Sequence, residues 1–137
     1  MLTSSLRASF IGRFNSTPKV HLKYFDVQGV AETIRHVLAL GNCDWTESKW
    51  PVDFKKFAGP DSLHKKDGPC PAFYEAEVNG ELVKNMDRAP IAIIDGKYTM
   101  GQSKTIERYL ARRLGLFGST EEEGADIHSN AEVWCPT

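Results

Sequence analysis

The sequence predicts one α/β domain with a mixed sheet, and three observations carry this prediction. Residues 19–25 and 44–50 have strand-length patterns and are separated by an amphipathic helical segment. Residues 90–94 form a short continuous apolar run of the kind that is buried on both faces of a sheet. The Asp95-Gly96 pair then predicts a tight hairpin into a return strand over residues 97–100.

The first strand and helix are read from their periodicities. Apolar and aromatic side chains alternate along residues 19–25, and Tyr24 falls near the carboxyl end of this strand. Open α/β sheets bind their ligands outside the carboxyl ends of parallel strands, so Tyr24 is a candidate site residue. The helix that follows is expected to end at Gly41-Asn42. Its expected buried residues are Val30, Ile34, Val37 and Leu38.

A second amphipathic helix follows Gly101 and is expected to stop at Gly115. Its expected core residues are Ile106, Tyr109, Leu110 and Leu114, with Lys104, Glu107, Arg108 and Arg112 on the polar positions. Gln102 and Ser103 stand where the helix begins. Either they only cap the helix, or the Ser103 N–H and hydroxyl and the Gln102 amide hold a carboxylate or phosphate there.

The segment between residues 51 and 87 is broken by Gly-Pro pairs and predicts loop, with helical composition only over residues 72–84. Thr120 and Glu123 form a capping box, which predicts a further helix that starts near Glu121.

Composition excludes several functional classes. The chain has 137 residues and a net charge of −1, and its 17 basic and 18 acidic residues are interspersed, so no basic stripe predicts a nucleic-acid partner. No apolar run reaches the roughly 18 residues of a membrane span. Cys43, Cys70 and Cys135 contain no Cys-x-x-Cys pair, which favours free thiols, and the histidines lack metal-ligand spacing.

Residues 1–18 are rich in Ser and Thr, contain Arg7 and Arg13, and have no acidic residue. A large apolar residue recurs at every fourth position there, which is typical of an organelle transit peptide, whereas the alternative is a disordered tail. The localisation predicted is cytoplasmic, or mitochondrial or plastid if this segment is a transit peptide.

Two motifs in the right order resemble the cytosolic glutathione transferases. Residues 90–113 contain Pro90, the Asp-Gly hairpin and MGQSKTIERYLARR, and residues 20–40, VHLKYFDVQGVAETIRHVLAL, are similar to the opening strand and helix of the sigma-like, tyrosine-type members. The resemblance implies a thioredoxin-like fold over residues 19–116. Residues 119–137 would be the truncated start of a helical second domain.

The resemblance also implies a site and a reaction. Tyr24 would donate a hydrogen bond to the glutathione thiolate, which then attacks an electrophile, with related isomerisation or peroxide reduction as variants. Ala89, before a cis bond to Pro90, would pair its backbone with the cysteinyl part of glutathione. Gln102 and Ser103 would take the γ-glutamyl end.

The glycine end of glutathione is implied to lie against Trp50 with Lys55 or Lys56, in a stretch longer than the family's. Glutathione is a co-substrate here, no other cofactor and no metal is implied, and a homodimer is the assembly expected. Val30 stands near the position where the sigma-like pattern has an arginine, and the loss of that positive charge would weaken activation of the thiol. The alternative is therefore a non-catalytic glutathione-binding or protein-interaction module, since by this resemblance most of the helical domain that forms the family's electrophile site would be missing.

Overall fold

The computed structural model describes residues 17–134, so the amphipathic segment predicted at the amino terminus lies almost wholly outside the described residues, as does Cys135. The elements are β1 (Val20–Phe25), η1 (Gly29–Ala31), α2 (Glu32–Leu40), β2 (Trp45–Trp50), η2 (Pro60–His64), α3 (Pro71–Val78), η3 (Val83–Asn85), β3 (Ile91–Ile94), β4 (Tyr98–Gly101), α4 (Ser103–Arg113) and α5 (Glu121–Trp134).

The four strands form one mixed sheet in the order β2-β1-β3-β4. β1 pairs parallel with β2 and antiparallel with β3, and β3 pairs antiparallel with β4. The parallel pair needs a crossover, which α2 supplies, whereas β3 and β4 are joined by the predicted hairpin. This topology confirms the α/β, thioredoxin-like fold predicted from the sequence.

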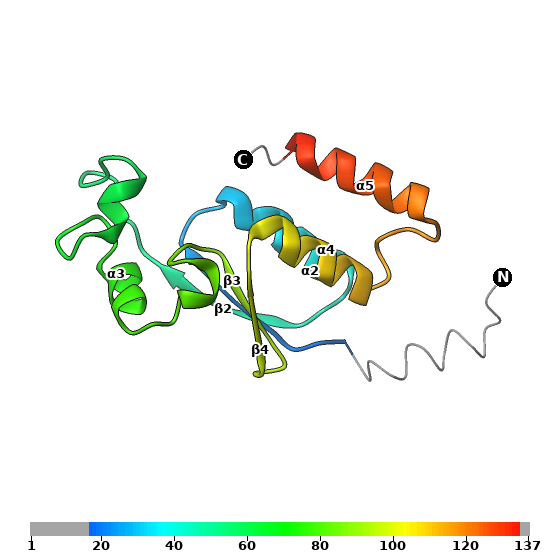
Figure 1. Ribbon diagram of the computed structural model, residues 1–137, viewed down its shortest axis with the longest axis horizontal. Helices are drawn as coiled ribbons and strands as arrows, with labels where there is room; N and C mark the ends of the chain where they lie inside the picture. The colour runs from blue at the N-terminus through cyan, green and yellow to red at the C-terminus, as the bar shows by residue number, and fades with distance from the viewer. Residues whose placement is uncertain (1–16, 135–137) are drawn as a thin grey trace.

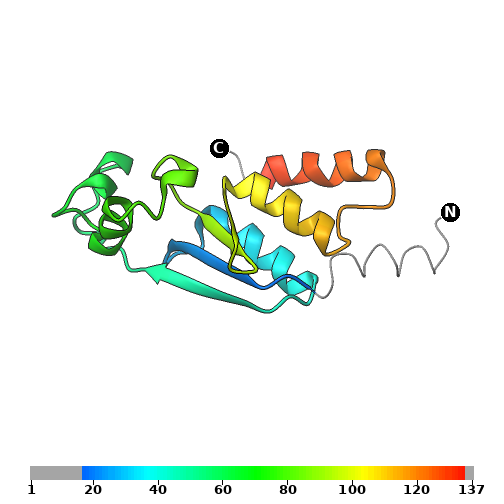
Figure 2. The ribbon, with the colours of Figure 1, turned by 60° about the horizontal axis from the view of Figure 1, so that its bottom comes forward.

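Two helices, α2 and α4, cover one face of the sheet (Figure 2). Ile34 and Leu38 of α2 and Ile106 and Leu110 of α4 are buried against the strands. Two expectations for these helices are wrong. Val30 is 37% exposed, because Gly29–Ala31 form a 3-10 turn that buries Ala31 instead, and Glu107 is buried although it was assigned to the polar face of its helix.

The other face carries a smaller, aromatic core at the carboxyl end of β2, where α3 packs (Figure 1). The Phe73 ring of α3 lies 4.9 Å from that of Phe25 and 5.4 Å from that of Trp50, measured between centroids. Pro71 opens α3 at a position where a missing N–H costs nothing. The two cores share Phe25, so the end of β1 is held from both sides.

The predicted turns and helix ends are confirmed. Asp95 and Gly96 have φ of 53° and 68°, the left-handed pair that a type I′ hairpin turn requires. α4 ends at the predicted Gly115, whose φ is 73°, and the Leu116 N–H donates to the Ala111 carbonyl at 2.7 Å in a Schellman-type cap.

Helix α5 starts where the capping box predicted and runs beside α4 in both ribbon views (Figures 1 and 2). Thr120 Oγ1 accepts a hydrogen bond from the Glu123 N–H at 3.1 Å. The Glu123 carboxylate accepts from the N–H and hydroxyl of Ser119, at 2.6 and 2.8 Å, so the return bond goes to the residue before the cap. These bonds lower the pKa of Glu123.

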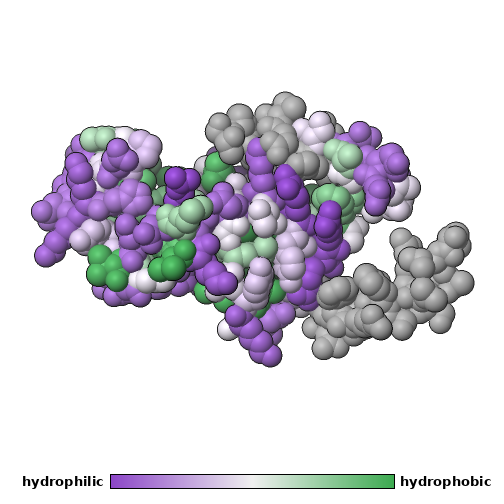
Figure 3. Space-filling view, viewed as in Figure 1, coloured by the Kyte–Doolittle hydropathy of each residue, from purple (hydrophilic) through white to green (hydrophobic). Residues whose placement is uncertain are grey.

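Hydrophilic side chains dominate the face drawn in Figure 3, and the strongly hydrophobic residues there form only small, separate groups. Val78, Val83 and Met86 are among the exposed apolar residues, at 65%, 69% and 71%. Over residues 17–134, none of the helices combines the length and the apolar character that crossing a membrane requires.

Candidate functional site

The sheet register brings most of the predicted site residues to one edge. Lys23 lies opposite Ile91, and Ile91 lies opposite Gly101. Tyr24 is the next residue of β1, Pro90 directly precedes β3, and Gln102 directly follows β4. These three residues, which are distant in sequence, therefore form one row at the sheet end that holds the carboxyl ends of β1, β2 and β4 and the amino end of β3.

A second row lies next to the first. Trp50 pairs with Phe25 at the ends of β2 and β1, Ala89 precedes Pro90 in the chain, and Ser103 follows Gln102 as the first residue of α4. The two rows contain every predicted site residue except Lys55, which is exposed on the loop after β2 and whose N–H donates to Asp53 Oδ1 at 3.1 Å.

The Tyr24 side chain is buried to 8% exposure, and its hydroxyl lies against the start of η1. The Val30 N–H approaches the phenol oxygen at 3.4 Å. Gly29 has a φ of 48°, and a Cβ at this position would overlap the Tyr24 hydroxyl. The backbone of the loop after β1 therefore fixes the hydroxyl, which keeps its own proton to donate.

Arg35 fixes this loop from the side of α2. Its Nη1 donates to the carbonyls of Val27 and Gln28 at 3.2 and 3.3 Å and to Glu32 Oε2 at 2.8 Å, and its Nε donates to Glu47 Oε1 at 3.0 Å. Burial disfavours the guanidinium charge, but the bonds to Glu32 and Glu47 outweigh it and raise the pKa of Arg35. The arginine therefore remains charged and bound to the loop.

The Ala89-Pro90 bond is cis, as the resemblance implied. Ala89 is half-buried, and within the described residues its N–H and carbonyl take no part in the backbone hydrogen bonds of the chain. Both groups are therefore available for strand-like pairing with an extended peptide at this edge.

Gln102 stands at the N-cap position of α4, but its side chain makes no capping bond. Gln102 therefore does not cap the helix through its side chain. Its φ of 70° with ψ of 116° is sparsely populated for a residue with a side chain, and such strain is found at functional sites. Its Nε2 donates to Asn85 Oδ1 at 2.8 Å.

The start of α4 supplies backbone donors beside Gln102. The first bond of the helix runs from the Ile106 N–H to the Gln102 carbonyl at 3.0 Å. The Ser103 N–H precedes this bond and points out of the helix end, where the dipole favours negative charge. The half-buried Ser103 side chain adds a hydroxyl to the same place.

Sequence reasoning missed Asn85 entirely. It is 2% exposed, although it lies in a stretch that predicts loop. Its Nδ2 donates to the carbonyls of Arg88 and Pro90 at 3.1 and 3.0 Å, and its Oδ1 accepts from Gln102. No sequence pattern signals this role, because an asparagine in a polar loop is ordinarily a turn residue.

Trp50 is 7% exposed and packs edge-on against Phe25 and Phe73, at centroid distances of 5.8 and 5.4 Å. It therefore has a structural role at the end of β2, whatever ligand its indole N–H also meets.

The described cysteines are inert. Cys43 and Cys70 are buried and free, and burial raises the pKa of each thiol, so neither is a nucleophile at neutral pH. Among the residues that the structure describes, no group of three or more His, Cys, Asp or Glu side chains could hold a metal ion.

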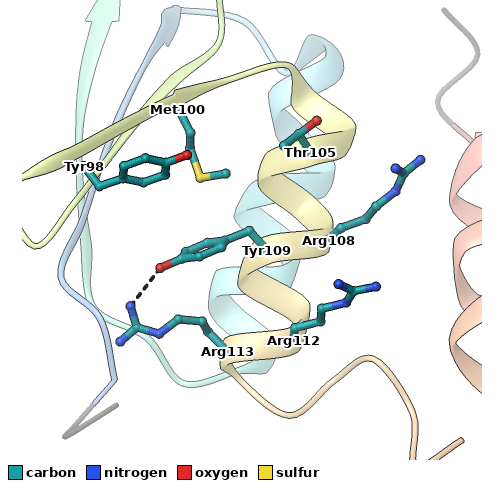
Figure 4. Close-up of a pocket in the computed structure, with 7 residues that line it drawn as sticks. All are labelled: Tyr98, Met100, Thr105, Arg108, Tyr109, Arg112 and Arg113. Atoms are coloured by element: carbon teal, nitrogen blue, oxygen red, sulfur yellow. Dashed lines mark hydrogen bonds between the residues drawn. The ribbon is translucent and has the colours of Figure 1, made fainter. Parts of the chain in front are cut away.

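A separate hollow of about 660 Å³ lies beside α4 and β4, and its lining does not include Tyr24 (Figure 4). Arg113 reaches from the helix to the Tyr109 hydroxyl and donates to it at 3.0 Å. The residues that line the hollow are Tyr98, Met100, Thr105, Arg108, Tyr109, Arg112 and Arg113.

Comparison with known proteins gives one consistent family. No family model matches the chain. Glutathione S-transferase 4 of Caenorhabditis elegans is 34% identical over 108 residues, which are 79% of this chain and 41% of that protein. Glutathione S-transferase P 1 of Xenopus laevis is 33% identical over 110 residues, which are 80% of this chain and 43% of that protein.

The fold agrees with this match. The structure of a Nu-class glutathione S-transferase from Haemonchus contortus superposes with a TM-score of 0.60 at 26% identity, over 85% of this chain and 46% of that one. The chain thus spans less than half the length of the relatives it matches. On sequence and fold together, it belongs to the glutathione S-transferase family and carries that family's thioredoxin-like domain.

Proposed function

We propose that the chain binds glutathione at the row Tyr24–Pro90–Gln102 and activates its thiol for conjugation to an electrophile. The observation that carries the proposal is the convergence of this row with the start of α4 at one sheet edge. A hydrogen-bond donor for a thiolate, a backbone segment that can pair with a peptide, and an anion site meet there. Binding a tripeptide with a central cysteine requires these three features. The sigma-like, tyrosine-type subclass is part of the proposal.

The γ-glutamyl end of glutathione carries a carboxylate and an ammonium group, and the site offers a partner of the right polarity to each. The Ser103 N–H and hydroxyl are donors at a helix start and suit the carboxylate. One Nε2 proton of Gln102 is bonded to Asn85 Oδ1, which fixes the amide, and its Oε1 is the acceptor for the ammonium. The peptide chain of the ligand then pairs with Ala89, and the glycine end points toward Trp50 and Lys55.

The thiol lies against the Tyr24 hydroxyl in this arrangement. A free thiol with a pKa of about 8.5 is about 3% ionised at pH 7. A hydrogen bond to a charged group contributes about 1.5–3 kcal/mol, which lowers the thiol pKa by about one to two units. The Val30 N–H, which approaches the Tyr24 oxygen, strengthens that donor and partly replaces the arginine that the family pattern places at this position.

A second candidate is a glutathione-binding module that does not activate the thiol. The exposed, apolar Val30 side chain favours it, because it brings no positive charge to the thiol. The electrophilic substrate, a homodimeric assembly and a cytoplasmic location are proposed from the family membership alone. The division into a glutathione-binding part over residues 19–116 and the start of a helical part over residues 119–137 is likewise proposed.

Titration calorimetry of the purified chain with glutathione tests the proposal. Ser103→Ala removes a hydroxyl but leaves the N–H and the helix dipole, so affinity should fall about five- to thirtyfold, or about 1–2 kcal/mol. Ser119→Ala makes the same change at the start of another helix, α5, and should leave affinity unchanged. Absence of glutathione binding by the parent chain, or equal effects of the two substitutions, would overturn the site assignment. Conjugation of glutathione to a chlorodinitrobenzene then separates the enzyme from the binding module.

A further inference from the structure

Asn85 connects three segments of the proposed site through one buried side chain. It closes η3, and its amide reaches both the residues around the cis bond and the start of α4. Its Nδ2 donates to the Arg88 and Pro90 carbonyls at 3.1 and 3.0 Å, and its Oδ1 accepts from Gln102 Nε2 at 2.8 Å. All the hydrogen-bonding capacity of Nδ2 is thereby used inside the protein.

The backbone is shaped around this side chain. Met86 and Asp87 both adopt left-handed φ, 52° and 58°, and the Arg88 N–H returns to the Asn85 carbonyl at 3.0 Å. On the other side, a Cβ on Gly101 would overlap the Asn85 side chain. The Asn85 side chain is thus surrounded by two consecutive residues with left-handed φ and by a glycine that cannot carry a Cβ. Such a backbone costs conformational free energy, which is unusual around a loop asparagine.

The acceptors around Asn85 allow only one orientation for its amide group and for that of Gln102. The Arg88 and Pro90 carbonyls are acceptors only, so Asn85 must turn its NH₂ group toward them and its oxygen toward Gln102. Gln102 must then turn its own NH₂ group toward Asn85. The Gln102 oxygen is then the end of the amide that is not used by Asn85.

We propose that Asn85 is a positioning residue that fixes the orientation of the Gln102 amide, so that the site presents an acceptor and selects a ligand with an ammonium group. Glutathione meets this requirement through its γ-glutamyl amine. The inference rests on the proposed glutathione site. It adds that Asn85, which contacts no ligand itself, sets the preference for ligands with an amino group over ligands without one.

The test is the ratio of two affinities, measured by calorimetry on the full chain. One ligand is glutathione, and the other is glutaryl-cysteinylglycine, which lacks only the α-amino group. In the parent chain glutathione should bind more tightly. Asn85→Ala should lower the ratio of the two affinities about three- to tenfold, because a Gln102 amide without a partner presents either end. The exposed Asn79→Ala serves as the matched control and should leave the ratio unchanged.

A second substitution separates positioning from folding. Gln102→Glu presents an acceptor in every orientation, so adding it to Asn85→Ala should restore the preference for glutathione. If Asn85→Ala weakens both ligands equally and leaves the ratio intact, Asn85 is only structural and the inference is wrong. If neither ligand binds the parent chain, the proposed function itself fails, and this inference fails with it.

Should Asn85→Ala not fold, the unmodified chain decides the question by nuclear magnetic resonance. The Nε2 proton of Gln102 that bonds to Asn85 should exchange slowly with water before glutathione is added, and its exchange rate should not change afterwards. Rapid exchange that becomes slow only when glutathione binds would show that the ligand, not Asn85, orients the amide.

Discussion

Replacing Gly29 with alanine tests how the loop after β1 fixes Tyr24. The residue has a φ of 48°, which costs an L-residue about 1–2 kcal/mol. Its new Cβ would also overlap the Tyr24 hydroxyl, and overpacking of this kind costs about 1–3 kcal/mol. The expected destabilisation is therefore about 2–5 kcal/mol, a fall in melting temperature of about 8–20 °C for a domain of this size.

Gly96→Ala is the matched control for this substitution. Gly96 has a φ of 68°, but a Cβ there would meet nothing within 4 Å. It should therefore show only the conformational cost, about 4–8 °C, in the same thermal melt followed by circular dichroism. Equal shifts for Gly29→Ala and Gly96→Ala would refute the reasoning, because the overlap with Tyr24 would then have no energetic effect.

Two further predictions concern the core and the last helix. Phe73→Ala should cost about 3–5 kcal/mol in chemical denaturation, because Phe73 is 2% exposed, whereas Phe54→Ala, at 68% exposure, should change stability by less than about 0.5 kcal/mol. Glu123 has a lowered pKa, caused first by the bond from the Ser119 N–H, so its contribution is present above the unfolded value of about 4.3 and is lost as pH falls through its folded pKa. In a titration by nuclear magnetic resonance its midpoint should lie below that of the other exposed glutamates, and Ser119→Pro should raise it; a midpoint at the ordinary value would contradict the cap.

The fold was predictable because its signals are local. Alternation along β1, the apolar run of β3 and the Asp95-Gly96 turn each specify one element, and the right-handed crossover through α2 leaves few topologies for them. The errors have the same origin. Val30 continues a helical pattern in the sequence, but the chain there forms a 3-10 turn that exposes it.

The site was predictable only in part. Tyr24 and Ser103 carry the resemblance to the family, and they lie at the same end of the sheet, Tyr24 near the end of β1 and Ser103 just after β4. Asn85 was not predictable, because its role depends on the carbonyls of Arg88 and Pro90 and on Gln102, which meet it only after the chain folds. Hydrogen bonds between segments leave no periodicity in a sequence, so a buried polar residue of this kind has to be found in three dimensions.

The central claim is that a hydrogen bond from the Tyr24 hydroxyl stabilises the thiolate of bound glutathione, and Tyr24→Phe tests it most directly, since it deletes only the hydroxyl and keeps the ring. The measurement is the thiolate absorbance of the glutathione complex against pH. The parent complex should show a thiol pKa about one to two units below that of free glutathione, and Tyr24→Phe should return it to the free value with little change in affinity. Tyr98→Phe, at an exposed tyrosine of β4, should leave the thiol pKa as in the parent. A parent complex whose thiol titrates as free glutathione does would contradict the claim, and so would a Tyr24→Phe complex that titrates as the parent.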